Sequence, residues 1–400
     1  MNWYPILKDN VEAHNKIEEI YLTLKKNSSY NYDLMGGSLG MAIFLLYYET
    51  FIKNMGNENN GINTLENTFE LVNKGSTSLK FAGGLSGFVW GVNHLANEGI
   101  IKTSGMGLNL LKPLLIKEML LEIKEGNYDF LHGAVGIAFC LLKYIKSKST
   151  IESLDKFLEI LLSNGIKEKN TIKWLSSAVH NQSINGVNFG LSHGLASIIG
   201  VLLSFIKANV SVSVCISTIN QTINYILKYK NKSQSLSVFP DFVTENLPVI
   251  YNGRLAWCYG DLGVAYTLWR ASEVLKREDV KIYAEKVLLE TTQRRNLAQN
   301  SIVDAGLCHG AAGVAHIYNR MYNHTKIEIF KETSLYWFKQ TLKMANHYDG
   351  LAGFKVWRPI DLGGIQNDPS LLEGVAGIGL ALISAVYGIE PKWDECLLLS

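Results

Sequence analysis

The stretch Gly306-Leu307-Cys308-His309-Gly310-Ala311-Ala312-Gly313 is one copy of a motif that recurs along the chain, and this recurrence decides the fold. Each copy has the form Gly-x-x-Gly and leads into an apolar run of helical length. The first glycines of the copies are Gly37, Gly84, Gly133, Gly194, Gly260, Gly310 and Gly374. In the fourth copy, Ser197 replaces the second glycine. An internal period of about 47 to 66 residues indicates a repeat architecture.

Each repeat is expected to contain two helices. The run after each motif is apolar on nearly every side, which predicts a helix that is buried all round. The segments between the motifs are amphipathic with helical spacing. They are Ile151–Leu162, Ser213–Lys228, Val280–Gln293 and Lys326–Met344. Strand-like alternation is nearly absent, and its best candidate is Ser235–Ile250.

Seven buried helices and seven half-polar helices predict an all-α fold, an α/α toroid. This is a double-layered helical barrel with seven inner and seven outer helices. An open solenoid is disfavoured because its end repeats need polar outer faces, and neither the first nor the last copy is more polar than its neighbours. The sequence predicts a single toroid domain over residues 1–400, with an inserted lobe or rim loop around residues 230–252.

Composition excludes several classes of function. The chain has 400 residues, of which 47% are hydrophobic and 18% charged, and its formal net charge is +2. No dense Lys/Arg face is visible, so a nucleic-acid partner is not expected. No apolar run approaches the ~20 residues of a membrane span, and no basic segment followed by an apolar one marks the N-terminus. We therefore expect a cytoplasmic protein with reduced thiols.

The residues just before each first glycine carry chemically distinct side chains. Close helix packing is a sufficient explanation for the glycines themselves, so function is sought in their neighbours. Because the inner helices of such a toroid run parallel, these loops should meet at one end of the barrel. The side chains that they contribute are Asp129, His193, Arg254, Cys258, Cys308 and His309.

Three of these side chains predict a metal site. Cys258 and Cys308 occupy matching positions of neighbouring repeats, and His309 follows the second cysteine. Two thiols and one imidazole supply the three ligands that a catalytic zinc needs while one position stays open. A helix N-terminus also favours thiolate over thiol. A single cysteine would be better explained as a buried structural thiol, but two at matching positions favour one Zn²⁺ per chain.

The motifs together resemble a known family. The elements WCYGDLG (257–263), GLCHGAAG (306–313) and GLSHGLAS (190–197), with the seven glycine copies, resemble the lanthionine synthetase C-like proteins, the stand-alone class I lantibiotic cyclases. The resemblance spans nearly the whole chain and implies the α/α toroid. The zinc ligands that it implies are Cys258, Cys308 and His309, with water or the substrate thiol as the fourth. The active-site residues that it implies are Asp129, His193, Arg254 and Tyr259.

The resemblance also implies an activity. It is the zinc-dependent Michael-type addition of cysteine thiols of a dehydrated precursor peptide to dehydroalanine or dehydrobutyrine, which gives lanthionine and methyllanthionine rings. We expect His193 to donate a proton to the enolate and Arg254 to stabilise its oxygen or anchor the peptide. Asp129 would orient or charge-balance one of them. Implied partners are a dehydratase and an ABC exporter, which would place a cytoplasmic enzyme at the membrane periphery.

Other interpretations remain open at this point. His193 could be a packed core histidine, Asp129 a helix N-cap, and Arg254 a rim residue paired with Asp261 or Glu245. A glycoside hydrolase on a helical toroid would need paired carboxylates, and the loops offer no obvious pair. A rival from a different class is a non-catalytic zinc protein that binds peptides or thiols as the scaffold of a peptide-modification complex.

Overall fold

The computed structural model describes residues 3–29, 31–53, 59–75, 78–102, 107–176, 186–231 and 235–400. The chain forms two compact units. The first unit comprises Met1–Ser78, Ala82–Ser104 and Arg294–Ser400. The second comprises Leu79–Phe81 and Gly105–Gln293. No helix among the described residues is both long enough and apolar enough to span a membrane.

Each copy of the glycine motif places its first glycine at the N-cap of a strongly buried helix. In the first unit these helices are α2 (Ser38–Tyr48), α4 (Leu85–Asn97), α12 (Ala311–Thr325) and α14 (Val375–Val386). In the second unit they are α6 (Ala134–Leu141), α8 (Leu195–Lys207) and α10 (Asp261–Leu275). Every residue of α2 and α14 is buried, so the prediction of helices buried all round is confirmed.

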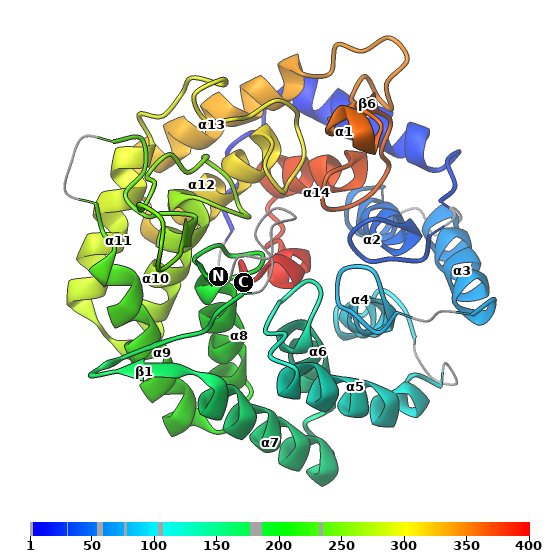
Figure 1. Cartoon of the computed structure of the whole chain (residues 1–400). Helices are drawn as coiled ribbons and strands as arrows, with labels where there is room; N and C mark the ends of the chain where they lie inside the picture. Colours follow the sequence, from blue (N-terminus) through cyan, green and yellow to red (C-terminus); the bar gives the residue numbers. More distant parts are fainter. Residues whose placement is uncertain are drawn as a thin grey trace. The chain divides into compact units, whose positions relative to one another are not determined.

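A second set of helices is amphipathic and covers the first. In the first unit it consists of α1 (Val11–Leu24), α3 (Asn60–Asn73) and α13 (Glu328–Lys343). In the second unit it consists of α5 (Lys112–Lys124), α7 (Lys148–Asn164), α9 (Val212–Lys228) and α11 (Glu278–Thr291). The four predicted amphipathic segments fall within or almost within α7, α9, α11 and α13. In Figure 1, α13 lies along α12 and α11 lies along α10.

Apart from two isolated β-bridges, the strands among the described residues form short two-stranded pairings. They are β1 (Ile166–Glu168) with β2 (Thr171–Lys173), β3 (Val187–Asn188) with β4 (Phe242–Val243), and β5 (Val356–Trp357) with β6 (Ile365–Gln366). Short irregular turns of helix are η1 (Glu49–Lys53), η2 (Leu108–Leu111), η3 (Leu142–Tyr144), η4 (Ile360–Leu362) and η5 (Lys392–Leu397).

Ser235–Ile250, the best candidate for strand-like alternation, forms only the two-residue strand β4. The start of this segment is held by the buried carboxylate of Asp261, the first residue of α10. It accepts backbone N–H bonds from Val238 at 3.0 Å and from Phe239 at 2.8 Å. These bonds satisfy donors that a strand would have given to a neighbour, and they pin the segment to the start of α10 as a loop.

Within the first unit, the last repeat packs against the first. Helix α14 contacts α2, and the N–H of Leu372 donates to the carbonyl of Met35 at 3.0 Å. A Cβ on Gly40 would lie 2.6 Å from the Cβ of Leu371, so the glycine permits this close approach. Contact between the terminal repeats is what a closed toroid requires and an open solenoid lacks.

Candidate active site

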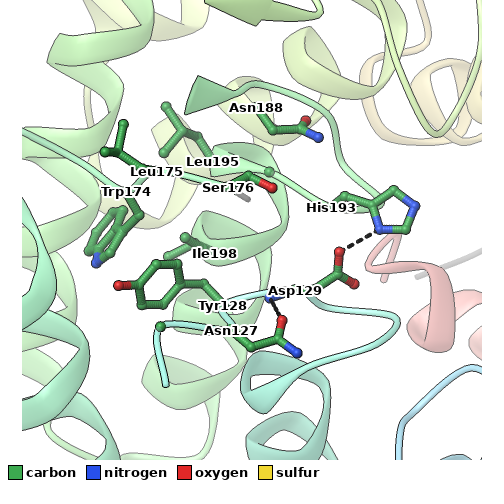
Figure 2. Close-up of a pocket in the computed structure, with 12 residues that line it drawn as sticks. Asn127, Tyr128, Asp129, Trp174, Leu175, Ser176, Asn188, His193, Leu195 and Ile198 are labelled. Atoms are coloured by element: carbon green, nitrogen blue, oxygen red, sulfur yellow. Dashed lines mark hydrogen bonds and ion pairs between the residues drawn. The ribbon is translucent and has the colours of Figure 1, made fainter. Parts of the chain in front are cut away.

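The loops before α6 and α8 in the second unit bring an acid and an imidazole together. The Nδ1 of His193 lies 2.7 Å from the Oδ2 of Asp129, as the dashed line in Figure 2 shows. The other carboxylate oxygen, Oδ1, accepts the backbone N–H of His132 at 2.7 Å. Asp129 therefore shapes its own loop, as a capping residue would, and also holds His193.

In this pair, Asp129 stabilises the protonated form of His193. Burial alone would lower the pKa of His193, but the hydrogen bond and charge of Asp129 outweigh it and raise that pKa above its ordinary value. Burial likewise pushes the pKa of Asp129 upward, and its bond to His193 reverses the shift to a net lowering. The His193 side chain is 25% exposed, which contradicts a packed core histidine. A half-exposed imidazolium can act as a general acid.

Tyr259 faces the same imidazole. Its ring centroid lies 6.1 Å from that of His193, at an interplanar angle of 32°. Its hydroxyl accepts a bond of 3.3 Å from the side-chain amide of Asn188. Burial raises the pKa of Tyr259 to about 12, so the phenol stays neutral at physiological pH and keeps its O–H donor.

Backbone bonds link the loop of Cys258 to the loop of His193. The carbonyl of Cys258 accepts the N–H of Leu191 at 3.0 Å and the hydroxyl of Ser192 at 3.2 Å. The residue after Tyr259 is Gly260, whose φ is +84° and whose added Cβ would overlap the carbonyl oxygen of Arg254. Glycine is therefore required at this turn, which sets the cysteine beside the acid–imidazole pair.

A small pocket adjoins the pair in the second unit. Its volume is about 80 Å³. Figure 2 shows Tyr128 and Trp174 at the end opposite His193, with the Asp129 carboxylate turned toward the imidazole. Its remaining labelled walls are Asn127, Leu175, Ser176, Asn188, Leu195 and Ile198. A space of this size accommodates a small side chain rather than a whole peptide segment.

Two residues of this region have no assigned role from sequence patterns. His132 stacks on His193 with ring centroids 5.7 Å apart and an interplanar angle of 20°. The sequence feature that points to His132 is its position in the same loop as Asp129, three residues further along the chain. Trp174 lines the pocket from the end of β2, and nothing in the glycine register points to it.

Arg254 lies half-buried in the loop before α10. The predicted alternative, an ion pair with Asp261 or Glu245, does not occur among the described residues. Asp261 instead binds the backbone of the 238–239 segment. No side-chain hydrogen bond or ion pair ties the guanidinium to another described residue, so its position does not depend on a rim ion pair.

The predicted metal ligands lie in matching loops of the two units. Cys258 is in the second unit and is 5% exposed. Cys308 and His309 are in the first unit, half-buried, and one ligand atom of each lies within 4.8 Å of the other. Neither cysteine forms a disulfide bond. A donor set of two thiols and one imidazole fits zinc, since thiolate and imidazole are the ligands that zinc prefers.

Comparison with known proteins identifies the family. The model of the lanthionine synthetase C-like proteins matches residues 28–398. The chain belongs to this family. The prediction made from the WCYG and CHG elements is thereby confirmed.

Two relatives support the assignment. The nisin biosynthesis protein NisC of Lactococcus lactis subsp. lactis is 25% identical over 298 residues, which cover 70% of this chain and 66% of that protein. The match thus spans slightly less than two thirds of the relative's length. The solved structure of a nisin cyclase matches with a TM-score of 0.76 and 20% identity, covering 96% of this chain and 97% of that one. This likeness confirms the predicted fold class, the α/α toroid.

Proposed function

We propose that this protein is a zinc-dependent lantibiotic cyclase that forms lanthionine and methyllanthionine rings in a dehydrated precursor peptide. The observation that carries the proposal is the 2.7 Å pair of Asp129 and His193, joined by backbone hydrogen bonds to the loop of the buried Cys258. Membership of the family adds support. A proton donor beside a thiol ligand is what the addition of a thiol to an alkene requires.

Cys258, Cys308 and His309 would hold one zinc ion. Bound there, zinc would supply a substrate thiolate at neutral pH, where a free cysteine thiol with a pKa of about 8.5 is mostly protonated. The assignment of these three residues as ligands of one zinc ion is our proposal. The toroid fold, in which the loops before the inner helices share one end, supports it.

The chain's own side chains would complete the reaction. The sulfur forms a bond to the β-carbon of dehydroalanine or dehydrobutyrine, the alkene π bond breaks, and an enolate develops. His193 delivers a proton to the α-carbon, while Asp129 holds the imidazole in its charged form. The thiol proton released at the start balances the one consumed. Arg254 stabilises the enolate oxygen, and Tyr259 packs beside His193 and orients its ring.

The chemistry of the substrate defines the surrounding partners that we propose. A dehydratase must remove water from serine and threonine residues before this protein can act, and an ABC exporter would take the product. These two partners would place the protein in the cytoplasm, and the exporter would hold it at the membrane periphery. The toroid would be one domain, with residues 230–252 as a rim loop near the peptide.

The test uses pure protein and a dehydrated, uncyclised lantibiotic precursor. Free thiols are counted by alkylation and mass spectrometry, and bound zinc is measured in parallel. We expect thiols to disappear without a change in peptide mass, and we expect Cys308→Ala to lose zinc and activity. The rival scaffold would bind one zinc and the peptide while every thiol stayed free. Cyclisation by Cys308→Ala at the normal rate would refute the ligand assignment.

A further inference from the structure

Asp304 occupies a position that recurs in the repeats, six residues before the first glycine. In several copies the side-chain oxygen at this position accepts the N–H two residues later, which closes an Asx turn. The bonds are Asn127 to Asp129 at 3.3 Å, Asn188 to Gly190 at 2.8 Å, Asp304 to Gly306 at 3.1 Å and Asp368 to Ser370 at 2.8 Å. One oxygen suffices for the turn, so an amide serves as well as a carboxylate.

The second oxygen of Asp304 has different partners. Its Oδ2 accepts the backbone N–H of Trp357 at 3.1 Å and lies 3.9 Å from the Nε2 of His309. The carboxylate is buried, with the residue only 5% exposed, and a buried charge needs such partners. A Cβ on Gly310 would lie 2.6 Å from its Oδ1. The backbone N of Gly306 would lie nearer still, so the glycine leaves room for the turn that Oδ1 closes.

A carboxylate on one ring nitrogen decides what the other nitrogen can do. A neutral imidazole carries one N–H and one lone pair, and an acceptor near Nε2 favours the tautomer with the proton there. Nδ1 then presents its lone pair to a metal. The gap of 3.9 Å exceeds a direct hydrogen bond, so the carboxylate acts through its charge or through a bridging water. Carboxylates play this role for many metal-bound histidines.

We propose that Asp304 is a positioning residue that fixes the His309 imidazole with its Nε2–H toward the carboxylate and leaves Nδ1 as the metal ligand. The proposal rests on the proposed zinc site and adds an outer partner and a ligating atom to it. Asp304 touches neither the peptide nor the reacting atoms in this assignment. Its effect therefore belongs to zinc affinity and ring orientation.

The experiment measures zinc affinity by competition with a chromophoric chelator in the full-length protein. Asp304→Asn keeps the turn acceptor, since asparagine fills this position in the third and fourth repeats, and it removes the charge. We expect zinc to bind about 10- to 100-fold more weakly. The matched control is Asp368→Asn, which makes the same change in the next repeat, where Oδ2 faces Arg358. It should keep the wild-type affinity within about twofold.

A second measurement needs no variant. Nitrogen-15 NMR of the zinc-loaded wild-type protein assigns which nitrogen of His309 binds the metal, and we expect Nδ1. Binding through Nε2, or an unchanged zinc affinity in Asp304→Asn, overturns the role of Asp304 and leaves the cyclase proposal standing. A wild-type protein that binds no zinc overturns both.

Discussion

Asp129 performs two tasks with its two carboxylate oxygens. One closes the loop by accepting the N–H of His132, and the other holds the imidazole of His193. Asparagine keeps an oxygen for the first task and loses the charge needed for the second. This separation makes Asp129→Asn an informative change.

We predict that Asp129→Asn lowers the cyclisation rate at pH 7.5 by about 10²-fold. Without the carboxylate, burial lowers the pKa of His193 against only the weaker opposing charge of Cys258, so less of the imidazole is protonated and able to donate a proton. Because the pKa of the proton donor falls, the alkaline limb of the pH–rate profile moves to lower pH in this variant. Initial rates with a dehydrated peptide between about pH 5.5 and 9 measure both effects.

The control for this variant is Asp33→Asn. Asp33 precedes Gly37 by the same four residues that separate Asp129 from Gly133, so the two changes remove one carboxylate from equivalent loops. We expect Asp33→Asn to keep the wild-type pH profile. Equal losses in the two variants would attribute the effect to general charge near the loops, and the pairing with His193 would then have no special role.

The distance of a residue from the first glycine of its repeat explains which site residues can be predicted from the sequence. Asp129, His193, Arg254 and Cys258 all lie within six residues of a repeat's first glycine, and the toroid gathers these positions. Trp174 could not be found in this way, because it reaches the pocket from β2. The stacking of His132 on His193 depends on side-chain directions that the glycine spacing does not encode.

At the scale of elements, the second glycine of several motifs lies against a backbone carbonyl oxygen, as Gly40, Gly136 and Gly313 do. A Cβ on Gly136 of α6 would overlap the carbonyl oxygen of Phe130 and lie 2.6 Å from the Cβ of Phe81. In the fourth repeat, Ser197 is fully buried, and its hydroxyl donates to the carbonyl of Gly194 at 2.7 Å. That copy therefore accommodates a Cβ where the third does not.

We predict that Gly136→Ala lowers the free energy of unfolding by about 1 to 3 kcal/mol. A loss of stability would be diagnostic of the contact, because alanine in a helix interior is otherwise about 0.5 to 1 kcal/mol more favourable than glycine. Chemical denaturation followed by circular dichroism measures the change. Ser197→Ala is the matched variant and should cost no more than about 1 kcal/mol, the value of one hydrogen bond. A stabilising Gly136→Ala would contradict the contact.

The helices could be predicted from the sequence because their pattern is local, whereas the conformation of the segment after α9 depends on a tertiary contact. A run that is apolar on all sides, such as α14, can only be a buried helix in a chain of this pattern. Ser235–Ile250 alternates like a strand near its start, but the backbone N–H groups of Val238 and Phe239 donate to the carboxylate of Asp261 instead of to a neighbouring strand. At these two residues a tertiary hydrogen-bond acceptor competes with strand pairing, and local alternation does not reveal it.

At the scale of the whole molecule, a buried charge cluster in the first unit ties the end of the chain to α12. Asp394 of η5 binds Arg320 through both of its oxygens and the Nε2 of His316 at 2.6 Å. Arg320 and His316 belong to α12, whose N-terminal loop carries Cys308. All three side chains are at most 1% exposed. Partners 74 and 78 residues apart could not be matched from the sequence alone.

We predict that Asp394→Asn lowers the free energy of unfolding by about 3 to 5 kcal/mol, because it leaves the guanidinium of Arg320 buried without a counter-charge. Urea denaturation followed by tryptophan fluorescence reports on it. Exchange of an exposed carboxylate, as in Glu159→Gln of α7, provides the comparison and should change stability by less than about 1 kcal/mol. A loss of similar size in both variants would show that the cluster contributes nothing special.

The same cluster predicts that acid weakens the fold. Burial lowers the pKa of His316, so the folded protein keeps this imidazole neutral while the unfolded chain takes up a proton below about pH 6.5. The pKa of Asp394 is also lowered: burial opposes the shift, and the charge of Arg320 outweighs it. Each group binds more protons when unfolded, so each removes stability as the pH falls.

His316 and Asp394 reduce the stability of the fold over different pH ranges, so their effects can be separated. That of His316 begins near pH 6.5, and that of Asp394 begins near its ordinary pKa of about 4. Urea midpoints measured from pH 8 to pH 4 should therefore decline in the wild type from about pH 6.5 downward. His316→Gln should flatten the upper part of this decline and leave the part near pH 4. If the variant declines in parallel with the wild type above pH 5, His316 is not the group that takes up the proton.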